Sequence, residues 1–177
     1  KYLNWPEDKL RLISSLRYRN KNKSKFSNNL VLPISLSSED ILIKQFENFL
    51  KKFEKKSIKP FIIKNHPLMS KSKTHKRFIS NLENILFKYN DRFSDEAKKS
   101  VSIFFAGTSA ILEALESGLT VIHICTDSVL ESYSETLWPS IKVHQINENI
   151  FEYNLRYYGK CINFSAENNV FEKYCNL

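Results

Sequence analysis

The sequence contains few of the residues that make tight turns or cross-links. Three glycines, five prolines and three cysteines are present among 177 residues. The cysteines, Cys125, Cys161 and Cys175, form neither an even set for disulfide pairing nor a metal-ligand spacing, which favours a reducing compartment. Because glycine is so scarce, a glycine placed between an apolar run and a helix-like run needs an explanation.

The sequence also lacks an apolar run long enough to cross a membrane, because Glu113 and Glu116 interrupt the best candidate. The first residues do not have the pattern of a secretory signal peptide. Since the chain begins with Lys1 and not with methionine, we expect its natural start to lie upstream. These features predict a cytoplasmic protein.

The charge of the chain is unbalanced towards lysine. Lys and Arg number 27 against 19 Asp and Glu, a net charge of +8, which suggests an anionic partner. The lysines occur in runs typical of solvated helix ends, such as Lys51-Lys52, Lys55-Lys56 and Lys98-Lys99. A basic nucleic-acid-binding protein is one alternative. However, the aromatic residues follow core periodicity and no motif that reads nucleic acid is present, so we expect no nucleic-acid partner.

Short apolar runs alternate with helical stripes along the chain. Strands are predicted at residues 10–16, 30–36, 61–63, 101–105, 119–124 and 141–146, and helices at 39–53, 78–89, 109–117 and 149–158. This alternation predicts an α/β fold, a Rossmann-like open parallel sheet of about five to six strands with helices on both faces. We expect one domain over residues 1–177, with 1–8 as a linker and 165–177 as a C-terminal tail.

The stretch Gly107-Thr108-Ser109 follows a predicted strand and opens a predicted helix. Gly107 has no Cβ, so a bound group can approach the backbone closely. Thr108 and Ser109 fall at the cap or first turn, where free backbone N–H groups and hydroxyls favour an anion. Glu113 lies about one turn further on and is a candidate for ribose hydroxyls. The same residue types also form ordinary helix caps, so the motif alone leaves both interpretations open.

A second candidate loop follows the strand predicted at residues 61–63. His66 precedes Pro67, which disfavours helical backbone and holds His66 extended. Lys64 points the same way as His66 if the strand continues through both. Ligands of open parallel sheets bind beyond the carboxyl ends of the strands. This loop and the Gly107 loop therefore open on one cleft if their strands lie close in the sheet.

These two loops, in this order, resemble the C-terminal, donor-binding half of a GT-B glycosyltransferase. The resemblance is to bacterial enzymes of surface carbohydrate and capsule synthesis, of the sialyl-, polysialyl- and Kdo-transferase-like type. In those proteins an HP motif and a later Ser/Thr motif bind the donor nucleotide, often CMP, and here His66-Pro67 and Thr108-Ser109 match them. The stretch GTSAILEALESGLTVI, residues 107–122, and the opening LNWPEDKLRLISSLRY, residues 3–18, are similar to their counterparts in GT-B enzymes.

The resemblance implies transfer of a sugar from a nucleotide donor to a glycan or lipid-linked acceptor, without a metal or other cofactor. It implies that Gly107, Thr108 and Ser109 bind phosphate with support from Lys64 and His66, and that Glu113 holds ribose. Arg17 is a further candidate for the cleft, and Asp127 and Ser128 are candidates for sugar contact. The catalytic base normally belongs to an N-terminal acceptor domain, so we assign none here and expect this chain alone to be inactive.

Other interpretations stay open at this point. His123 and Cys125 point to one face of a predicted strand, and with His144 on the next predicted strand they form a weak zinc candidate beside simple packing. Tyr133 and Trp138 belong to a surface segment, a lid or a domain contact. A non-catalytic nucleotide- or phosphate-binding domain is the main alternative function. The lysines at positions 21, 23 and 25 suggest peripheral contact with the inner membrane.

Overall fold

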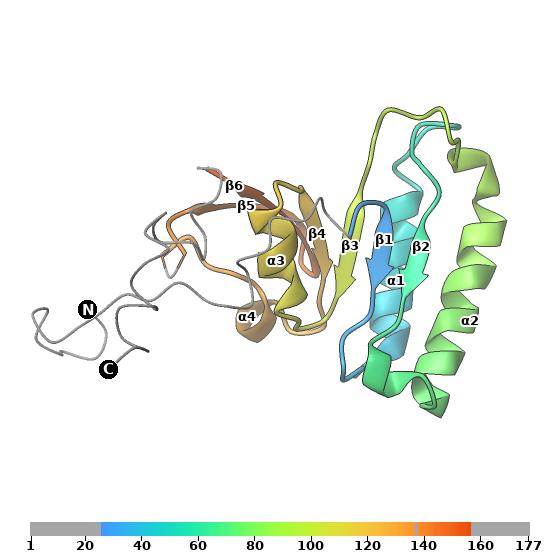
Figure 1. The fold of residues 1–177 in the computed structure, drawn as a ribbon, viewed down its shortest axis with the longest axis horizontal. Helices are drawn as coiled ribbons and strands as arrows, with labels where there is room; N and C mark the ends of the chain where they lie inside the picture. Colours follow the sequence, from blue (N-terminus) through green and yellow to red (C-terminus); the bar gives the residue numbers. More distant parts are fainter. Residues whose placement is uncertain (1–25, 137, 157–177) are drawn as a thin grey trace, which may run out of the picture.

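A computed structural model describes residues 26–136 and 138–156 of the chain. They form a six-stranded open sheet with the order β2-β1-β3-β4-β6-β5 (Figure 1). The strands are β1 (Asn29–Val31), β2 (Ile62–Lys64), β3 (Ser102–Phe105), β4 (Val121–Ile124), β5 (Ile141–Asn147) and β6 (Ile150–Leu155). The pairs among β2, β1, β3 and β4 are parallel, whereas β6 is antiparallel to both β4 and β5. The α/β, Rossmann-like class is therefore confirmed, with a mixed sheet in place of a wholly parallel one.

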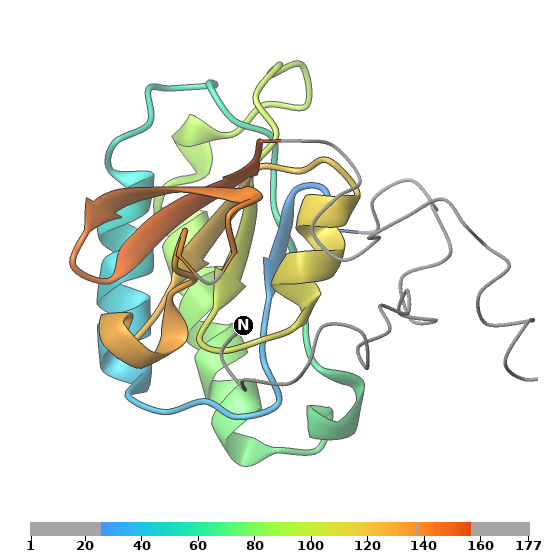
Figure 2. The same ribbon diagram turned by 90° about the vertical axis from the view of Figure 1, so that its left-hand side faces the viewer.

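Helices cover both faces of this sheet. They are α1 (Glu39–Leu50), α2 (Lys73–Lys88), α3 (Ala110–Glu116) and α4 (Ser128–Glu131), with short 3₁₀ turns η3 (Pro67–Met69) and η4 (Asn90–Arg92). Helices α1 and α2 lie together on one face and α3 lies on the other (Figure 2). Helix α2 starts earlier than the apolar stripe predicts, because the side chain of Ser72 caps it by accepting the backbone N–H of His75. No helix in the described part of the chain is both long and apolar enough to cross a membrane.

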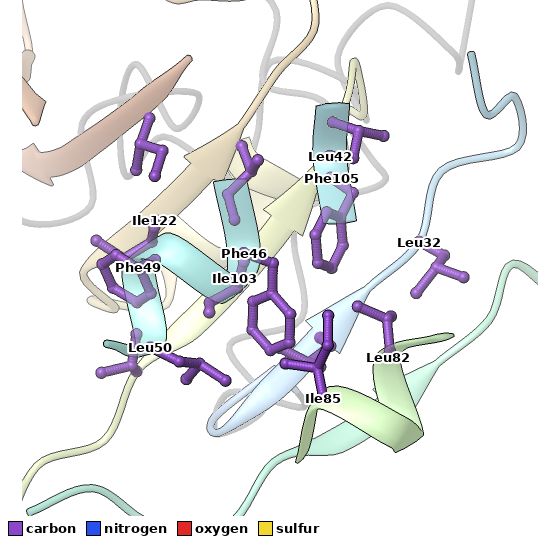
Figure 3. Packing of buried hydrophobic residues seen from close by; sticks show 14 of the residues in the cluster. Leu32, Leu42, Phe46, Phe49, Leu50, Leu82, Ile85, Ile103, Phe105 and Ile122 are labelled. Carbon is purple, nitrogen blue, oxygen red and sulfur yellow. The ribbon is translucent and has the colours of Figure 1, made fainter. Parts of the chain in front are cut away.

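The core is built on both faces of the parallel strands, as their continuous apolar runs predict. On β3, Ile103 and Phe105 face α1 and α2, while Phe104 belongs to the cluster beneath α3. Figure 3 shows how side chains of α1, α2 and the strands meet on the first face. There the ring of Phe46 meets that of Phe105 edge to face, with centroids 5.8 Å apart.

Ion pairs on the outer surface join α1 to α2. The Arg77 guanidinium binds both carboxylate oxygens of Glu39, at 2.6 and 3.3 Å. Further along, Lys88 and the Tyr89 hydroxyl both donate to one oxygen of Glu47, at 2.6 and 2.9 Å. These hydrogen bonds lower the pKa of Glu47. Exposed pairs of this kind contribute at most about 1 kcal/mol each, so the buried apolar face holds the helices in place.

The helix predicted at residues 149–158 is wrong, because residues 150–155 form strand β6. Phe151, Tyr153 and Leu155 alternate along the chain and all join the cluster beneath α3, a period of two that is typical of a strand. Glu148 and Asn149 form the turn between β5 and β6. The predicted strand at 10–16, the linker at 1–8, the tail at 165–177 and the lysines at 21, 23 and 25 lie outside the described residues.

Candidate functional site

The two predicted loops leave the same edge of the sheet. Strand β1 pairs with β2 on one side and with β3 on the other, all parallel, so their carboxyl ends share one edge. The loop after β1, residues 32–38, therefore lies between the His66 loop and the Gly107 loop. In sheets of this order, the crevice between β1 and β3 is the position where ligands usually bind. Residues 32–38 were not among the sequence candidates.

The chain turns after β3 at Ala106, which has a left-handed backbone conformation with φ of 49°. This conformation costs an alanine about 1–2 kcal/mol. Gly107, the next residue, is exposed, does not have positive φ, and would have no atom within 4 Å of an added Cβ. Backbone conformation and protein packing therefore do not require glycine at position 107. The space in front of it is open to solvent or to a ligand.

Thr108 performs the ordinary capping role in this turn. Its Oγ1 accepts the backbone N–H of Ala110 at 3.3 Å. Ser109 is exposed, and its hydroxyl makes no cap hydrogen bond. Helix α3 has only seven residues and carries Glu113 half-buried in its first turn, so its dipole is a weak attraction for an anion. The helix dipole therefore contributes less to anion binding than the sequence suggested. The backbone N–H groups and the Ser109 hydroxyl remain as candidate donors to an anion.

The loop after β2 has the predicted extended residue before proline. His66 has φ of −65° and ψ of 131°. Its Nδ1 accepts the backbone N–H of Leu68 at 3.3 Å, so in the neutral ring Nε2 carries the proton and is a donor. Strand β2 ends at Lys64, so the strand alternation that would align Lys64 with His66 does not extend that far. The Lys64 ammonium instead lies 5.6 Å from the ring centroid of Phe26.

The turn after β4 carries acidic side chains. Asp127 is exposed, and Ser128 begins α4. The backbone N–H and hydroxyl of Thr126 donate to the carboxylate of Glu131, at 3.2 and 2.9 Å. Carboxylates accept hydrogen bonds from hydroxyls and repel phosphate. This part of the edge therefore suits a sugar better than a phosphate group. Arg17, the remaining binding candidate, lies outside the described residues.

His123 is completely buried on β4 and uses both ring nitrogens. Nε2 lies 2.9 Å from the carbonyl oxygen of Ala106, and Nδ1 lies 3.1 Å from the hydroxyl of Tyr153. Burial lowers the pKa of His123 to about 4, and the bond to the Ala106 carbonyl only partly opposes this. The ring is therefore neutral at neutral pH. The sequence indicated a buried His on a strand, but it did not indicate these partners.

The strand order contradicts the zinc candidate formed by His123, Cys125 and His144. Strand β6 lies between β4 and β5, so His144 is not on the strand next to His123. Cys125 is buried, and burial together with nearby Glu131 and Asp127 raises the pKa of its thiol to about 12. Within residues 26–136 and 138–156, no group of three or more His, Cys, Asp or Glu side chains is arranged to hold a metal ion.

The other aromatic candidates pack on the α3 side of the sheet. The Tyr133 ring meets those of Trp138 and Tyr153 edge to face, with centroids 5.9 and 5.3 Å apart. Both Tyr133 and Trp138 are half-buried against the cluster beneath α3. In this structure they are part of that packing.

His75 is a residue that sequence reasoning missed. It lies in the first turn of α2 and is buried. Its Nε2 lies 3.0 Å from the carbonyl oxygen of Pro33, and its Nδ1 lies 3.2 Å from Oγ of Ser72. A carbonyl only accepts, so Nε2 donates to Pro33, and in the neutral ring Nδ1 then accepts from the Ser72 hydroxyl. The only sequence signal was a histidine three residues after a capping serine.

Comparison with known proteins finds no matching family model, no matching curated protein and no matching solved structure.

Proposed function

We propose that this chain binds the nucleotide part of an activated sugar donor at the carboxyl edge of β1, β2 and β3. The observation that carries the proposal is that the His66 loop and the Gly107 loop leave this edge on either side of β1. The two motifs that resemble the donor-binding motifs of GT-B enzymes therefore share one edge, although His66 and Gly107 are 41 positions apart in the sequence (107 − 66). In Figure 1 the arrowheads of β1, β2 and β3 mark this edge.

The chemistry of the loops suits a nucleotide phosphate. Gly107 presents an exposed backbone, Ser109 an exposed hydroxyl, and His66 an Nε2–H donor. Donors arranged in advance stabilise the charge that develops on a leaving phosphate as a glycosidic bond breaks. Lys64 and Glu113 have supporting roles, at phosphate and ribose respectively. Asp127 and Ser128 follow β4 and are the candidates for contact with the sugar.

Under this proposal, the described residues bind a donor but do not transfer its sugar. None of them is assigned as the base that deprotonates an acceptor hydroxyl. An N-terminal acceptor domain would supply that base. The acceptor would be a glycan or lipid-linked glycan, and sugar transfer would take place in the cytoplasm or at the inner membrane surface. The main alternative is a nucleotide- or phosphate-binding domain with no transferase partner. An upstream Rossmann-like half with a candidate Asp, Glu or His base would favour the transferase.

The test is calorimetric titration of the chain with CMP, CDP, UDP and GDP, repeated with Ser109→Ala and His66→Ala. Loss of one hydrogen bond to a charged phosphate weakens binding about tenfold or more. Ser80→Ala, at an exposed serine of α2, and His144→Ala, at an exposed histidine of β5, are matched controls. We expect selective binding of one nucleotide, weakened by the two site variants and unchanged in the controls. A folded chain that binds none of the four contradicts the proposal.

A further inference from the structure

We propose that His123 and Tyr153 are positioning residues that turn the backbone N–H of Gly107 outward, towards the phosphate of the donor. This inference rests on the proposed function for the identity of the ligand. It rests on the observed hydrogen bonds for the orientation of the peptide.

A chain of hydrogen bonds runs from the surface segment after α4 to the turn after β3. The backbone N–H of Tyr133 donates to the Tyr153 hydroxyl at 3.2 Å. That hydroxyl lies 3.1 Å from Nδ1 of His123, and Nε2 of His123 lies 2.9 Å from the carbonyl oxygen of Ala106. His123 and Tyr153 are both completely buried.

The donor and acceptor of each hydrogen bond can be assigned by starting from the Ala106 carbonyl. The Ala106 carbonyl can only accept, so Nε2 of His123 carries a proton. In a neutral ring Nδ1 is then an acceptor, which requires the Tyr153 hydroxyl to donate to it. The same hydroxyl oxygen accepts from Tyr133, so every group in the chain is satisfied in one arrangement. Burial, which lowers the pKa of His123, keeps the ring in that neutral form.

The orientation of the Ala106 carbonyl determines that of the next N–H. The two groups belong to one peptide unit, and in a trans peptide they point in opposite directions. No cis peptide occurs in the described part of the chain. Since the carbonyl points into the core at His123, the N–H of Gly107 points away from the core. Gly107 itself is exposed, and an added Cβ would have no atom within 4 Å, so the residue offers room for a ligand.

The same contacts hold Ala106 in its left-handed conformation. Its N–H donates to the carbonyl of Ile124 at 2.8 Å, while its carbonyl accepts from His123. With both groups held by β4, the alanine keeps a φ of 49° that it would otherwise rarely adopt. His123 therefore has a role at the edge of the sheet although it does not itself reach a ligand.

The experiment compares three substitutions in this chain of hydrogen bonds. Each variant is titrated by calorimetry with the nucleotide that the wild type binds. His123→Leu removes the donor to Ala106, and His123→Gln keeps a side-chain N–H that can reach the same carbonyl. Tyr153→Phe removes only the hydroxyl. Ile85→Val, in α2, is a control that lowers stability without touching the turn. Amide spectra of Gly107 and urea unfolding of each variant report the turn and the fold separately.

We expect His123→Leu to weaken nucleotide binding about ten- to a hundredfold, the effect of losing one oriented donor to a charged group. His123→Gln should restore most of the affinity, Tyr153→Phe should fall between them, and Ile85→Val should bind like the wild type. Wild-type affinity in folded His123→Leu, or equal losses in His123→Leu and His123→Gln, would overturn the inference.

A wild-type chain that binds no nucleotide would overturn the proposed function instead. The positioning role is then decided by the Gly107 amide resonance. A shift of that resonance in His123→Leu, absent from His123→Gln, supports the role, and an unchanged resonance rejects it.

Discussion

Nε2 of His75 donates to the carbonyl oxygen of Pro33 at 3.0 Å, across 42 positions of the sequence. Nε2 of His123 makes the equivalent contact with Ala106 at 2.9 Å. Pro33 follows β1 and Ala106 follows β3, and these strands are neighbours in the sheet. Both turns that flank the candidate crevice are therefore held by a buried histidine that donates to a backbone carbonyl.

Replacing His75 with leucine should destabilise the fold. The change leaves the Pro33 carbonyl without its buried donor and removes the partner of the Ser72 hydroxyl. An unsatisfied buried polar group costs about 1–3 kcal/mol, so the free energy of unfolding in urea should fall by that amount. Ser72→Ala should cost about 1 kcal/mol through loss of the α2 cap. The double variant should cost less than the sum, and strict additivity would show that the two contacts are independent.

The stability of the chain should depend on pH through His123. Its pKa is about 4 in the folded protein against 6.5 for the free side chain, so between these values the unfolded state binds more protons. The free energy of unfolding therefore falls as the pH drops from 6.5 to about 4, by about 3 kcal/mol in all. The measurement is the difference in the free energy of unfolding between wild type and His123→Gln at each pH, because this difference isolates the contribution of His123. A difference that does not change with pH would contradict the buried neutral ring.

Substitutions at the adjacent positions 106 and 107 distinguish the effect of backbone strain on stability from the effect of an added methyl group on ligand binding. Ala106→Gly should raise the free energy of unfolding by about 1 kcal/mol, because glycine adopts left-handed backbone without steric cost. Gly107→Ala should change stability by less than about 0.5 kcal/mol, since nothing lies near the added methyl group. If a ligand approaches Gly107, the same variant should bind nucleotide more weakly. Urea unfolding and calorimetry on both variants test these outcomes, and a large loss of stability in Gly107→Ala would reject the geometry described for the turn.

The thiol of Cys125 should be unreactive in the folded chain. Burial and the nearby carboxylates of Glu131 and Asp127 raise its pKa to about 12, so almost no thiolate is present at neutral pH. In a Cys161→Ser, Cys175→Ser background, labelling by a disulfide reagent should be at least about a hundredfold slower than in urea. Equal rates with and without urea would show that the end of β4 is open to solvent.

Local sequence patterns were enough to predict most of the parallel part of the fold. Helical stripes predicted α1 and α2, and continuous apolar runs predicted β3 and β4, because burial on two faces requires apolar residues at every position. The extended backbone of His66 followed from Pro67 alone, since that restriction acts between neighbouring residues.

The antiparallel edge was missed because its pairing is not local. The alternation of Phe151, Tyr153 and Leu155 was present in the sequence, but the charged and aromatic residues around it also suited a helix. In the structure these residues form β6, because they pair with both β4 and β5. The position of β6 between β4 and β5 also separates His144 from His123.

Residue patterns along the chain are enough to predict an α/β sheet with Gly107 and His66 in loops after apolar strands. The shared edge of these loops around β1, and the hydrogen bonds from His75 and His123 to the turns beside it, follow from tertiary contacts. Periodicity in the sequence indicates only which side of a helix or strand is buried. The partner of a buried donor depends on which strands become neighbours, and that is set by contacts between residues far apart in the chain.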